Sequence, residues 1–187
     1  LQATYAIVSM DSVSGLTVDT NQIILDAILK TLEGANRDIL CSVLLTSSDG
    51  KHLIAGSGPS LPDFYNAATN NLPIGAGVGS CGTAAFTRKR VIVEDIATHP
   101  YWATFTEIAE KAGLGSCWSE PIFGTDNTLL GTFGIYHAEP YSPTVDDFHL
   151  IEYVTLLTAI AIERSKTSEQ LKLSSRVFND THEGIAI

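Results

Sequence analysis

Cysteine is scarce in this chain of 187 residues, and the three that occur lie far apart at Cys41, Cys81 and Cys117. Their number is odd and none belongs to a C-x-x-C pair, which argues against a disulfide framework and against a structural zinc site. The five histidines are equally scattered, with no H-x-x-x-H pair. This usage fits a reducing cytoplasm best and leaves the cofactor unknown.

Positive charge and long apolar runs are also lacking. Eleven Lys and Arg face 21 Asp and Glu, which gives a net charge of −10 and a pI of about 4.7. Such a surface repels phosphate backbones and anionic lipid, so we expect neither nucleic acid nor membrane contact. No apolar run approaches the ~20 residues of a membrane span, and residues 1–15 lack the basic start of a signal peptide. Because the chain begins at Leu1 rather than Met, it is interpreted as a fragment of a longer protein.

What is present is typical of a globular domain, with 44% apolar and 17% charged residues. Apolar residues at helical spacing predict a helix over 19–34. A short β-prone segment at 39–46 is followed by an Asp-Gly turn and a second apolar segment at 51–58. Together they predict a β-hairpin.

The remainder of the chain alternates helices and strands. We predict helices at 61–71, 80–90 and 142–176, a loop and a helix within 99–113, and strands at 91–96, 117–123 and 129–139. Ser80 stands at the start of one helix, and Thr144 is placed to cap the last, with Asp146 and Asp147 in its first turn. Two tight hairpins require antiparallel neighbours, so the predicted fold is α/β (α+β). It has three layers, a central antiparallel sheet of five to six strands and helices on both faces.

The hexamer "GVGSCG" at 77–82 fits the G-x-G-x-x-G pattern of dinucleotide-binding loops. That reading requires a buried strand before the glycines, a helix after them and an acidic residue about 20 positions on. Here a loop containing Pro73 precedes the glycines, and Glu94 and Asp95 come too soon. The pattern therefore does not indicate a dinucleotide site.

The same region closely resembles the core of a GAF domain. The resemblance lies in "PIGAGVGSCGTAAFTRKRVIVEDI" (73–96), in "CWSEPIFGTDNTLLGTFGIYHAEP" (117–140) and in the closing helix. It predicts an upstream linker at 1–16, a GAF sensor domain at 17–166 and a signalling-helix linker at 167–187. The last stretch, 176–187, resembles the opening of a PAS domain.

This resemblance implies a regulatory module without catalysis of its own. GAF domains of this kind occur in multidomain bacterial signalling proteins, often histidine kinases or cyclic-di-GMP enzymes. In them a small molecule or a redox change controls an output further along the chain. The resemblance also places the ligand cavity beside the helix that starts near Ser80. The predicted ligand-binding residues are Ser80, Cys81, Thr83, Asp95, Trp118 and Tyr136.

Several of these residues have an alternative role in plain structure. The glycines of 77–82 serve either a sharp turn or a pocket wall. Asp95 either holds the loop that follows it or accepts a hydrogen bond from a ligand. Trp102, Trp118, Phe133 and Tyr136 form either an aromatic pocket or ordinary core. Strand alternation groups Leu129, Phe133, Ile135 and His137 on one face and Leu130, Thr132 and Tyr136 on the other, which we expect to face the cavity.

Three other activities are weighed against a sensor. Free methionine sulfoxide reductases share the GAF fold and a G-x-C-G cysteine, which would make Cys81 a nucleophile. Cys117, however, lies closer to the S-x-P-I motif than the enzyme pattern expects, so a buried core cysteine is the alternative. His137 and His149 are candidate haem ligands, and Cys81 or Cys117 a candidate bilin attachment, each without a supporting motif. The N-K-F-D-E set of cyclic-nucleotide-binding GAF domains is not found.

The closing helix predicts self-association. Leu150, Val154, Leu157 and Ala161 follow a 4-3-4 spacing, while the positions beyond are mostly polar. We expect a parallel homodimer through this helix and the helix at 19–34. A solvated helix that merely ends the domain, or a dimerisation module that binds nothing, are the alternatives.

Overall fold

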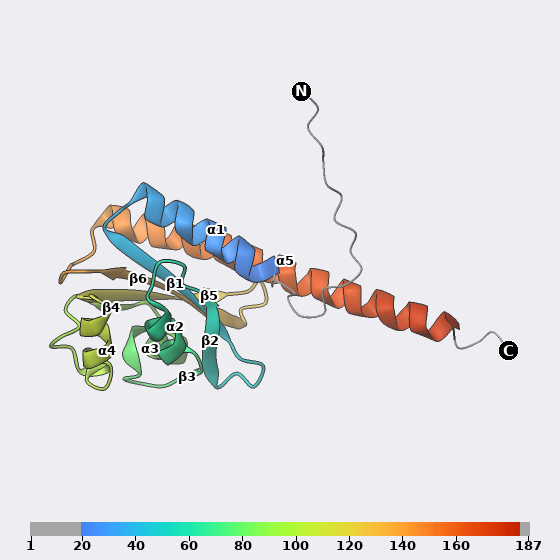
Figure 1. Cartoon of the computed structure of the whole chain (residues 1–187), viewed down its shortest axis with the longest axis horizontal. Helices are drawn as coiled ribbons and strands as arrows, with labels where there is room; N and C mark the ends of the chain where they lie inside the picture. Colours follow the sequence, from blue (N-terminus) through green and yellow to red (C-terminus); the bar gives the residue numbers. More distant parts are fainter. Residues whose placement is uncertain (1–19, 184–187) are drawn as a thin grey trace, which may run out of the picture.

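Six strands form one sheet in a computed structural model, which describes residues 20–183 (Figure 1). The strands are β1 Ile39–Thr46, β2 His52–Ser57, β3 Leu72–Pro73, β4 Val91–Val93, β5 Ser116–Phe123 and β6 Leu129–His137. Their order is β3-β2-β1-β6-β5-β4, and every neighbouring pair is antiparallel. The predicted antiparallel sheet is confirmed, although the two-residue strand β3 falls where no strand was predicted.

Helices cover both faces of this sheet, as predicted. One face carries α1 (Thr20–Ala35) and the first part of α5 (Val145–Glu183), which lie side by side (Figure 1). The other face carries α2 (Asp63–Thr69), α3 (Gly79–Thr87), the 3-10 turn η1 (Pro100–Trp102) and α4 (Thr106–Lys111). The sheet therefore separates a two-helix layer from a layer of short helices and loops.

Each layer has its own core. On the α1–α5 side, helix residues such as Leu29 and Ile162 pack against Val43, Trp118 and Phe133 of the strands. On the other side, aromatic and aliphatic side chains of the short helices cover the sheet in two clusters. The seven residues 79–85 at the start of α3 are all buried, and none has a large side chain. Because these side chains are small, α3 approaches the sheet closely.

Two predicted elements end earlier than expected. The helix predicted over 80–90 stops at Thr87, because Arg88 adopts the left-handed conformation with φ 57°. The strand predicted over 91–96 is paired only as far as Val93. Ser80 does not cap α3: the capping position is Val78, which makes no side-chain capping bond.

The closing helix begins at Val145, directly after the predicted cap Thr144 and three residues later than the predicted start at 142. The Thr144 hydroxyl accepts from the amide of Asp147 at 3.3 Å, and the Asp147 carboxylate accepts from the amide of Thr144 at 2.7 Å. The helix then continues to Glu183, past the predicted end at 176, and its C-terminal part extends beyond the sheet (Figure 1). Residues 184–187 of the predicted PAS start lie outside the described residues. No helix within 20–183 is long and apolar enough to cross a membrane.

The predicted faces of β6 hold for Phe133, Ile135 and Tyr136 but are wrong at its start. The pairing with β5 is irregular between Ile122 and Phe123, where the ladder passes from Gly131 directly to Leu129. This bulge shifts the alternation by one residue. Leu129 therefore packs on the side of α3, and Leu130 joins the core beneath α1 and α5.

Gly131 provides a test of how closely the central strands are packed. A Cβ atom at this position would lie 2.0 Å from the Leu44 carbonyl oxygen of the neighbouring strand. We expect Gly131→Ala to lower the free energy of unfolding by at least about 2 kcal/mol, because backbone must move. Urea denaturation followed by circular dichroism measures this change.

Gly34→Ala is the matched control, since a Cβ there meets nothing within 4 Å. Because Gly34 lies in a helix, this change should raise stability by roughly 0.5–1 kcal/mol. Equal effects of the two substitutions would show that the described strand packing is wrong.

Candidate functional site

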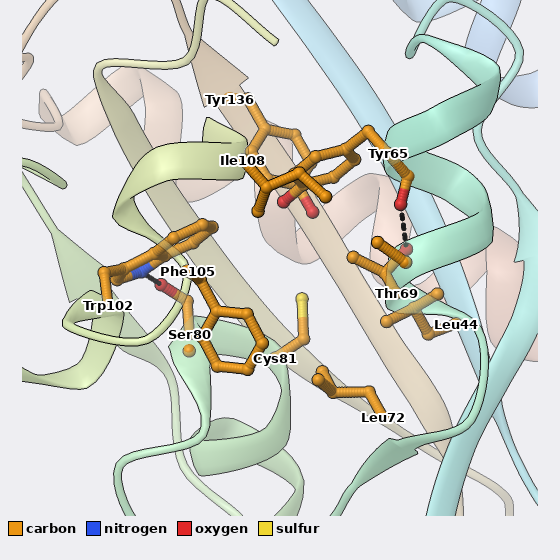
Figure 2. Close-up of a pocket in the computed structure, with 12 residues that line it drawn as sticks. Leu44, Tyr65, Thr69, Leu72, Ser80, Cys81, Trp102, Phe105, Ile108 and Tyr136 are labelled. Carbon is orange, nitrogen blue, oxygen red and sulfur yellow. Dashed lines mark hydrogen bonds between the residues drawn. The ribbon is translucent and has the colours of Figure 1, made fainter. Parts of the chain in front are cut away.

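A small cavity lies between the sheet and the layer of short helices (Figure 2). Its volume is about 30 Å³, roughly the share of one water molecule in the liquid. Residues from four helical segments and three strands line it: Leu44, Tyr65, Ala68, Thr69, Leu72, Gly79, Ser80, Cys81, Trp102, Phe105, Ile108 and Tyr136. The lining is mostly apolar and contains no charged side chain.

The glycine-rich segment makes the start of α3 fit against this cavity. Gly77 and Gly79 have φ angles of 75° and 55°, which side-chain-bearing residues rarely adopt. At Gly82, a Cβ would lie 2.7 Å from the carbonyl oxygen of Pro73. The segment therefore serves both roles considered from the sequence, since it makes a sharp turn and it also forms a wall of the cavity.

Ser80 connects three elements at one end of the cavity. Its hydroxyl accepts from the Trp102 indole Nε1 at 2.9 Å (Figure 2). It also donates to the Cys117 carbonyl at 3.3 Å. These bonds fix α3 to β5 and hold the Trp102 ring over the cavity. Ser80 lines the cavity as predicted, but its hydroxyl already has two protein partners.

Two tyrosines close the opposite end. The Tyr136 hydroxyl lies 3.1 Å from the Ser42 hydroxyl, and the Tyr65 ring packs edge-on against Tyr136 at 5.8 Å between centroids. Burial raises the pKa of both phenols well above the ordinary value. Tyr136 faces the cavity as the strand alternation predicted. Tyr65 comes from a short helix that has no motif, so no sequence pattern pointed to it.

Cys81 lines the cavity at the start of α3, and Cys117 lies fully buried in β5 beneath that helix. Cys117 pairs directly with Tyr136 in the sheet, so both side chains point toward α3. The neighbouring Cys117 thiol and nearby hydroxyls lower the pKa of Cys81 despite its burial. Burial, with the Cys81 thiol alongside, raises the pKa of Cys117.

The floor of this site also holds two buried hydroxyls, those of Ser119 and Thr132. Neither has a hydrogen-bond partner among the described residues. A buried hydroxyl without a partner costs about 1–3 kcal/mol. Their position beneath α3 therefore indicates a polar floor under an apolar cavity.

Thr83 and Asp95 do not line the cavity, contrary to the prediction. The Thr83 hydroxyl is buried and donates to the Gly79 carbonyl at 2.6 Å, one helical turn back. The Asp95 carboxylate accepts from the amide of Ala97 at 3.0 Å and the hydroxyl of Thr98 at 2.8 Å. Asp95 thus holds its own loop, which is the structural role considered for it.

Trp118 lies on the opposite face of the sheet from the cavity. It follows Cys117 in β5, and successive side chains of a strand point to opposite faces. Its ring packs in the core under α1 and α5 and stacks on Tyr141 at 5.4 Å. The predicted aromatic pocket is therefore half right, because Trp102 and Tyr136 line the cavity while Trp118 and Phe133 do not.

The candidate haem ligands also lie elsewhere. His137 is stacked against Trp118 and Tyr141, and desolvation lowers its pKa. His149 is exposed on α5. Neither borders the cavity, and no cluster of three or more metal-ligating side chains occurs within the part of the chain that the structure describes.

The Ser80–Trp102 bond gives a double-mutant test of the site. Ser80→Ala leaves the buried indole N–H without a partner, and we expect it to lower stability by about 1–3 kcal/mol. In a Trp102→Phe background the same change should cost less, because no indole donor is left unpaired. Urea denaturation of the four proteins gives the coupling energy, and strictly additive effects would contradict the bond.

Comparison with known proteins matches residues 18–163 to the family described as the GAF domain. One curated relative is the methyl sulfide methyltransferase-associated sensor of Methanosarcina acetivorans, 38% identical over 147 residues. That alignment covers 79% of this chain but only 15% of the relative. The chain therefore spans a small part of that protein.

Solved structures share the fold at lower identity. A domain of a protein assigned as a two-component sensor histidine kinase from Sinorhizobium meliloti is 16% identical with a TM-score of 0.65, covering 81% of this chain and 96% of that chain. The free methionine-R-sulfoxide reductase of Neisseria meningitidis, solved with its substrate, is 20% identical with a TM-score of 0.61. There the coverage is 79% of this chain and 80% of that chain.

Proposed function

We propose that this chain, which belongs to the GAF domain family, is a regulatory sensor module without catalysis of its own. Its cavity is the sensing site, and its closing helix passes the response to an output elsewhere in a longer protein. The observation that carries this proposal is the connection between the cavity wall α3 and the helix α5, through the three residues that follow α3.

The lining sets the chemistry of the ligand. It offers aromatic and aliphatic surface with a few hydroxyls and one thiol, and no charged side chain. A charged ligand would lose its hydration without gaining a partner. The small volume further favours a neutral molecule of a few heavy atoms. The curated relative is by name a sensor associated with a methyl sulfide methyltransferase, and dimethyl sulfide has the polarity that this lining suits. The lining side chains must move apart to admit it, because the cavity as it stands has room for about one water molecule.

The connection to α5 runs through Arg90. Its guanidinium pairs with Glu120 of β5 and lies 3.2 Å from the Glu152 carboxylate of α5. It also lies over the Phe148 ring of the same helix, 4.9 Å from the centroid. A shift of α3 therefore moves a side chain that contacts α5 directly.

The output lies outside the domain in this proposal. We place the module in the cytoplasm, upstream of a histidine kinase or cyclic-di-GMP enzyme. Residues 167–187 would form the signalling linker into a PAS domain. The continuous helix α5 supports such a linker, because it spans roughly 58 Å at about 1.5 Å per residue.

Methionine sulfoxide reduction is the rival function, and the lining argues against it. Free methionine sulfoxide is a zwitterion and needs partners for an ammonium and a carboxylate. The cavity supplies neither, and its volume is far below that of an amino acid. The likeness to the reductase supports a shared fold alone.

Ala68 provides a direct test of the sensing site, because it lies exposed at the edge of the cavity. In wild-type protein, dimethyl sulfide should shift the NMR amide signals of Gly79 and Cys81. Ala68→Trp should abolish these shifts by covering the entrance. Ala67→Trp, on the neighbouring exposed residue outside the lining, should leave them intact.

The same NMR titration distinguishes a sensor from a methionine sulfoxide reductase. Free methionine sulfoxide should shift none of these signals, and it should not be turned over with a dithiol reductant. Equal shifts in both tryptophan variants would place binding outside the cavity, and turnover would establish the enzyme.

We also propose that the module is a homodimer through α1 and α5. A row of large apolar side chains on α5 is exposed, including Tyr153 at 62%, Leu156 at 60% and Ile160 at 47%. Beside it, an apolar groove runs between α1 and α5. The apolar seam predicted on α5 is only partly available to a second copy, because Val154 is buried in the domain's own core. A second copy of the same helices matches this surface, because both partners present the same apolar row.

Sedimentation tests this interface with Leu157→Asp combined with Ile160→Asp. We expect the wild type to be a dimer and the variant a folded monomer, because both side chains are partly exposed and their replacement opens no cavity. Phe86→Asp is the control, since Phe86 is 57% exposed on α3, away from this surface. A monomeric wild type would contradict the interface, as would a Phe86→Asp protein that dissociates equally.

A further inference from the structure

Three polar side chains of the cavity lining have no proton left for a ligand. The Thr69 hydroxyl donates to a backbone carbonyl of its own helix, at 3.1 Å from the Tyr65 carbonyl oxygen. The Trp102 indole donates to Ser80, and the Ser80 hydroxyl donates to the Cys117 carbonyl. Each of these bonds is made within the protein, so none of the three groups needs a ligand to satisfy its proton.

The two tyrosines at the other end of the cavity differ from these groups. Tyr65 and Tyr136 are each only 2% exposed, and Figure 2 shows both hydroxyls directed toward the cavity. The Tyr136 hydroxyl is hydrogen-bonded to that of Ser42 at 3.1 Å. Apart from Tyr136, against which its ring packs, no described residue is a hydrogen-bond partner for the Tyr65 hydroxyl.

A count of protons shows that this group of hydroxyls has one donor in excess. Ser42, Tyr136 and Tyr65 each carry one hydroxyl proton, whereas a chain of three neighbours makes at most two hydrogen bonds. One proton therefore has no acceptor within the group, whichever way each bond runs. When Ser42 donates to Tyr136 and Tyr136 donates to Tyr65, the proton left over is that of Tyr65, which lines the cavity.

Both phenols remain donors at neutral pH. Burial raises the pKa of Tyr65 and of Tyr136 well above the ordinary value, so each keeps its proton. The lining contains no charged side chain, so a charged ligand would find no partner of opposite charge there. The excess proton is therefore matched to a neutral acceptor.

The cavity already has room for the accepting atom. Its volume of about 30 Å³ is roughly the share of one water molecule, which is enough for an oxygen atom. Only the rest of a ligand requires the lining to separate. That rest meets apolar side chains, which suit methyl groups: Leu44, Leu72, Phe105 and Ile108.

We propose that the Tyr65 hydroxyl donates a hydrogen bond to an acceptor oxygen of a small neutral ligand, whose methyl groups lie against the apolar lining. This narrows the ligand class to neutral molecules with one strong acceptor, such as a sulfoxide or a ketone. A thioether sulfur is a weak acceptor, so dimethyl sulfide leaves the Tyr65 proton without a good partner. The inference rests on the proposed function, because it concerns the same cavity. Tyr136, with Ser42 behind it, is the positioning residue that orients the Tyr65 proton.

Matched ligands with and without the oxygen test this inference in the 187-residue chain. Dimethyl sulfoxide and dimethyl sulfide carry the same methyl groups, and acetone carries its oxygen on carbon instead of sulfur. NMR titrations that follow the amides of Gly79 and Cys81 give the three affinities. Water solvates the sulfoxide more strongly than the sulfide, so the informative comparison is between proteins for each ligand.

Tyr65→Phe removes the proposed donor and keeps the ring that packs on Tyr136. We expect it to weaken the binding of dimethyl sulfoxide and of acetone by roughly two- to tenfold, the range for one neutral hydrogen bond, and to leave dimethyl sulfide binding unchanged. Thr69→Val is the matched control, because it removes a lining hydroxyl whose proton goes to a backbone carbonyl. Cys81→Ala removes the weak thiol donor of the lining. Neither control should change the affinity of the oxygen ligands relative to dimethyl sulfide.

The outcome separates this inference from the sensor proposal. If Tyr65→Phe weakens all three ligands equally, or none of them, the Tyr65 hydroxyl is not the donor and the inference is wrong. Dimethyl sulfide binding that still depends on Ala68 would in that case leave the sensor proposal intact. If none of the three ligands binds the wild type, the neutral-ligand proposal and this inference are both wrong.

Discussion

The close contact between α3 and the sheet is the constraint on which the rest of the structure depends. Residues 79–85 are all buried and small, and at Gly82 even a methyl group would meet the Pro73 carbonyl at 2.7 Å. Side chains of ordinary size would hold the helix further from β5. Only the short approach lets Ser80 reach the Cys117 carbonyl.

The close contact between α3 and the sheet also explains why the floor of the site is polar while the rest of the cavity lining is apolar. Between α3 and the strands there is room only for thiols and hydroxyls. The larger space beside α3 is enclosed by Tyr65, Trp102 and Phe105 from elements that pack around it. The helix α3 thus forms one wall of the small cavity. Arg90, three residues after the end of α3, contacts α5. The cavity and the connection to α5 therefore both depend on the helix α3.

The sequence was sufficient for the fold and for part of the site. Short-range patterns set the hairpins, the sheet type and the cap at Thr144, because each depends on neighbouring residues. Ser80, Cys81 and Tyr136 were found because a helix start and strand alternation orient them. Trp118 was wrongly predicted to bind the ligand, although the same alternation places its side chain on the other face of the sheet from that of Cys117. Tyr65 could not be predicted as a lining residue, because its place in the cavity wall depends on how distant elements pack in three dimensions.

The central claim is that a displacement of α3 reaches α5, and amide hydrogen exchange of Gly82→Ala tests it most directly. The added methyl group must push the start of α3 away from Pro73. We predict faster exchange in α3 and also in α5 around Phe148 and Glu152, while the central amides of β1 keep their protection. Exchange that rises in α3 and β3 alone, or equally throughout β1, would contradict the claim.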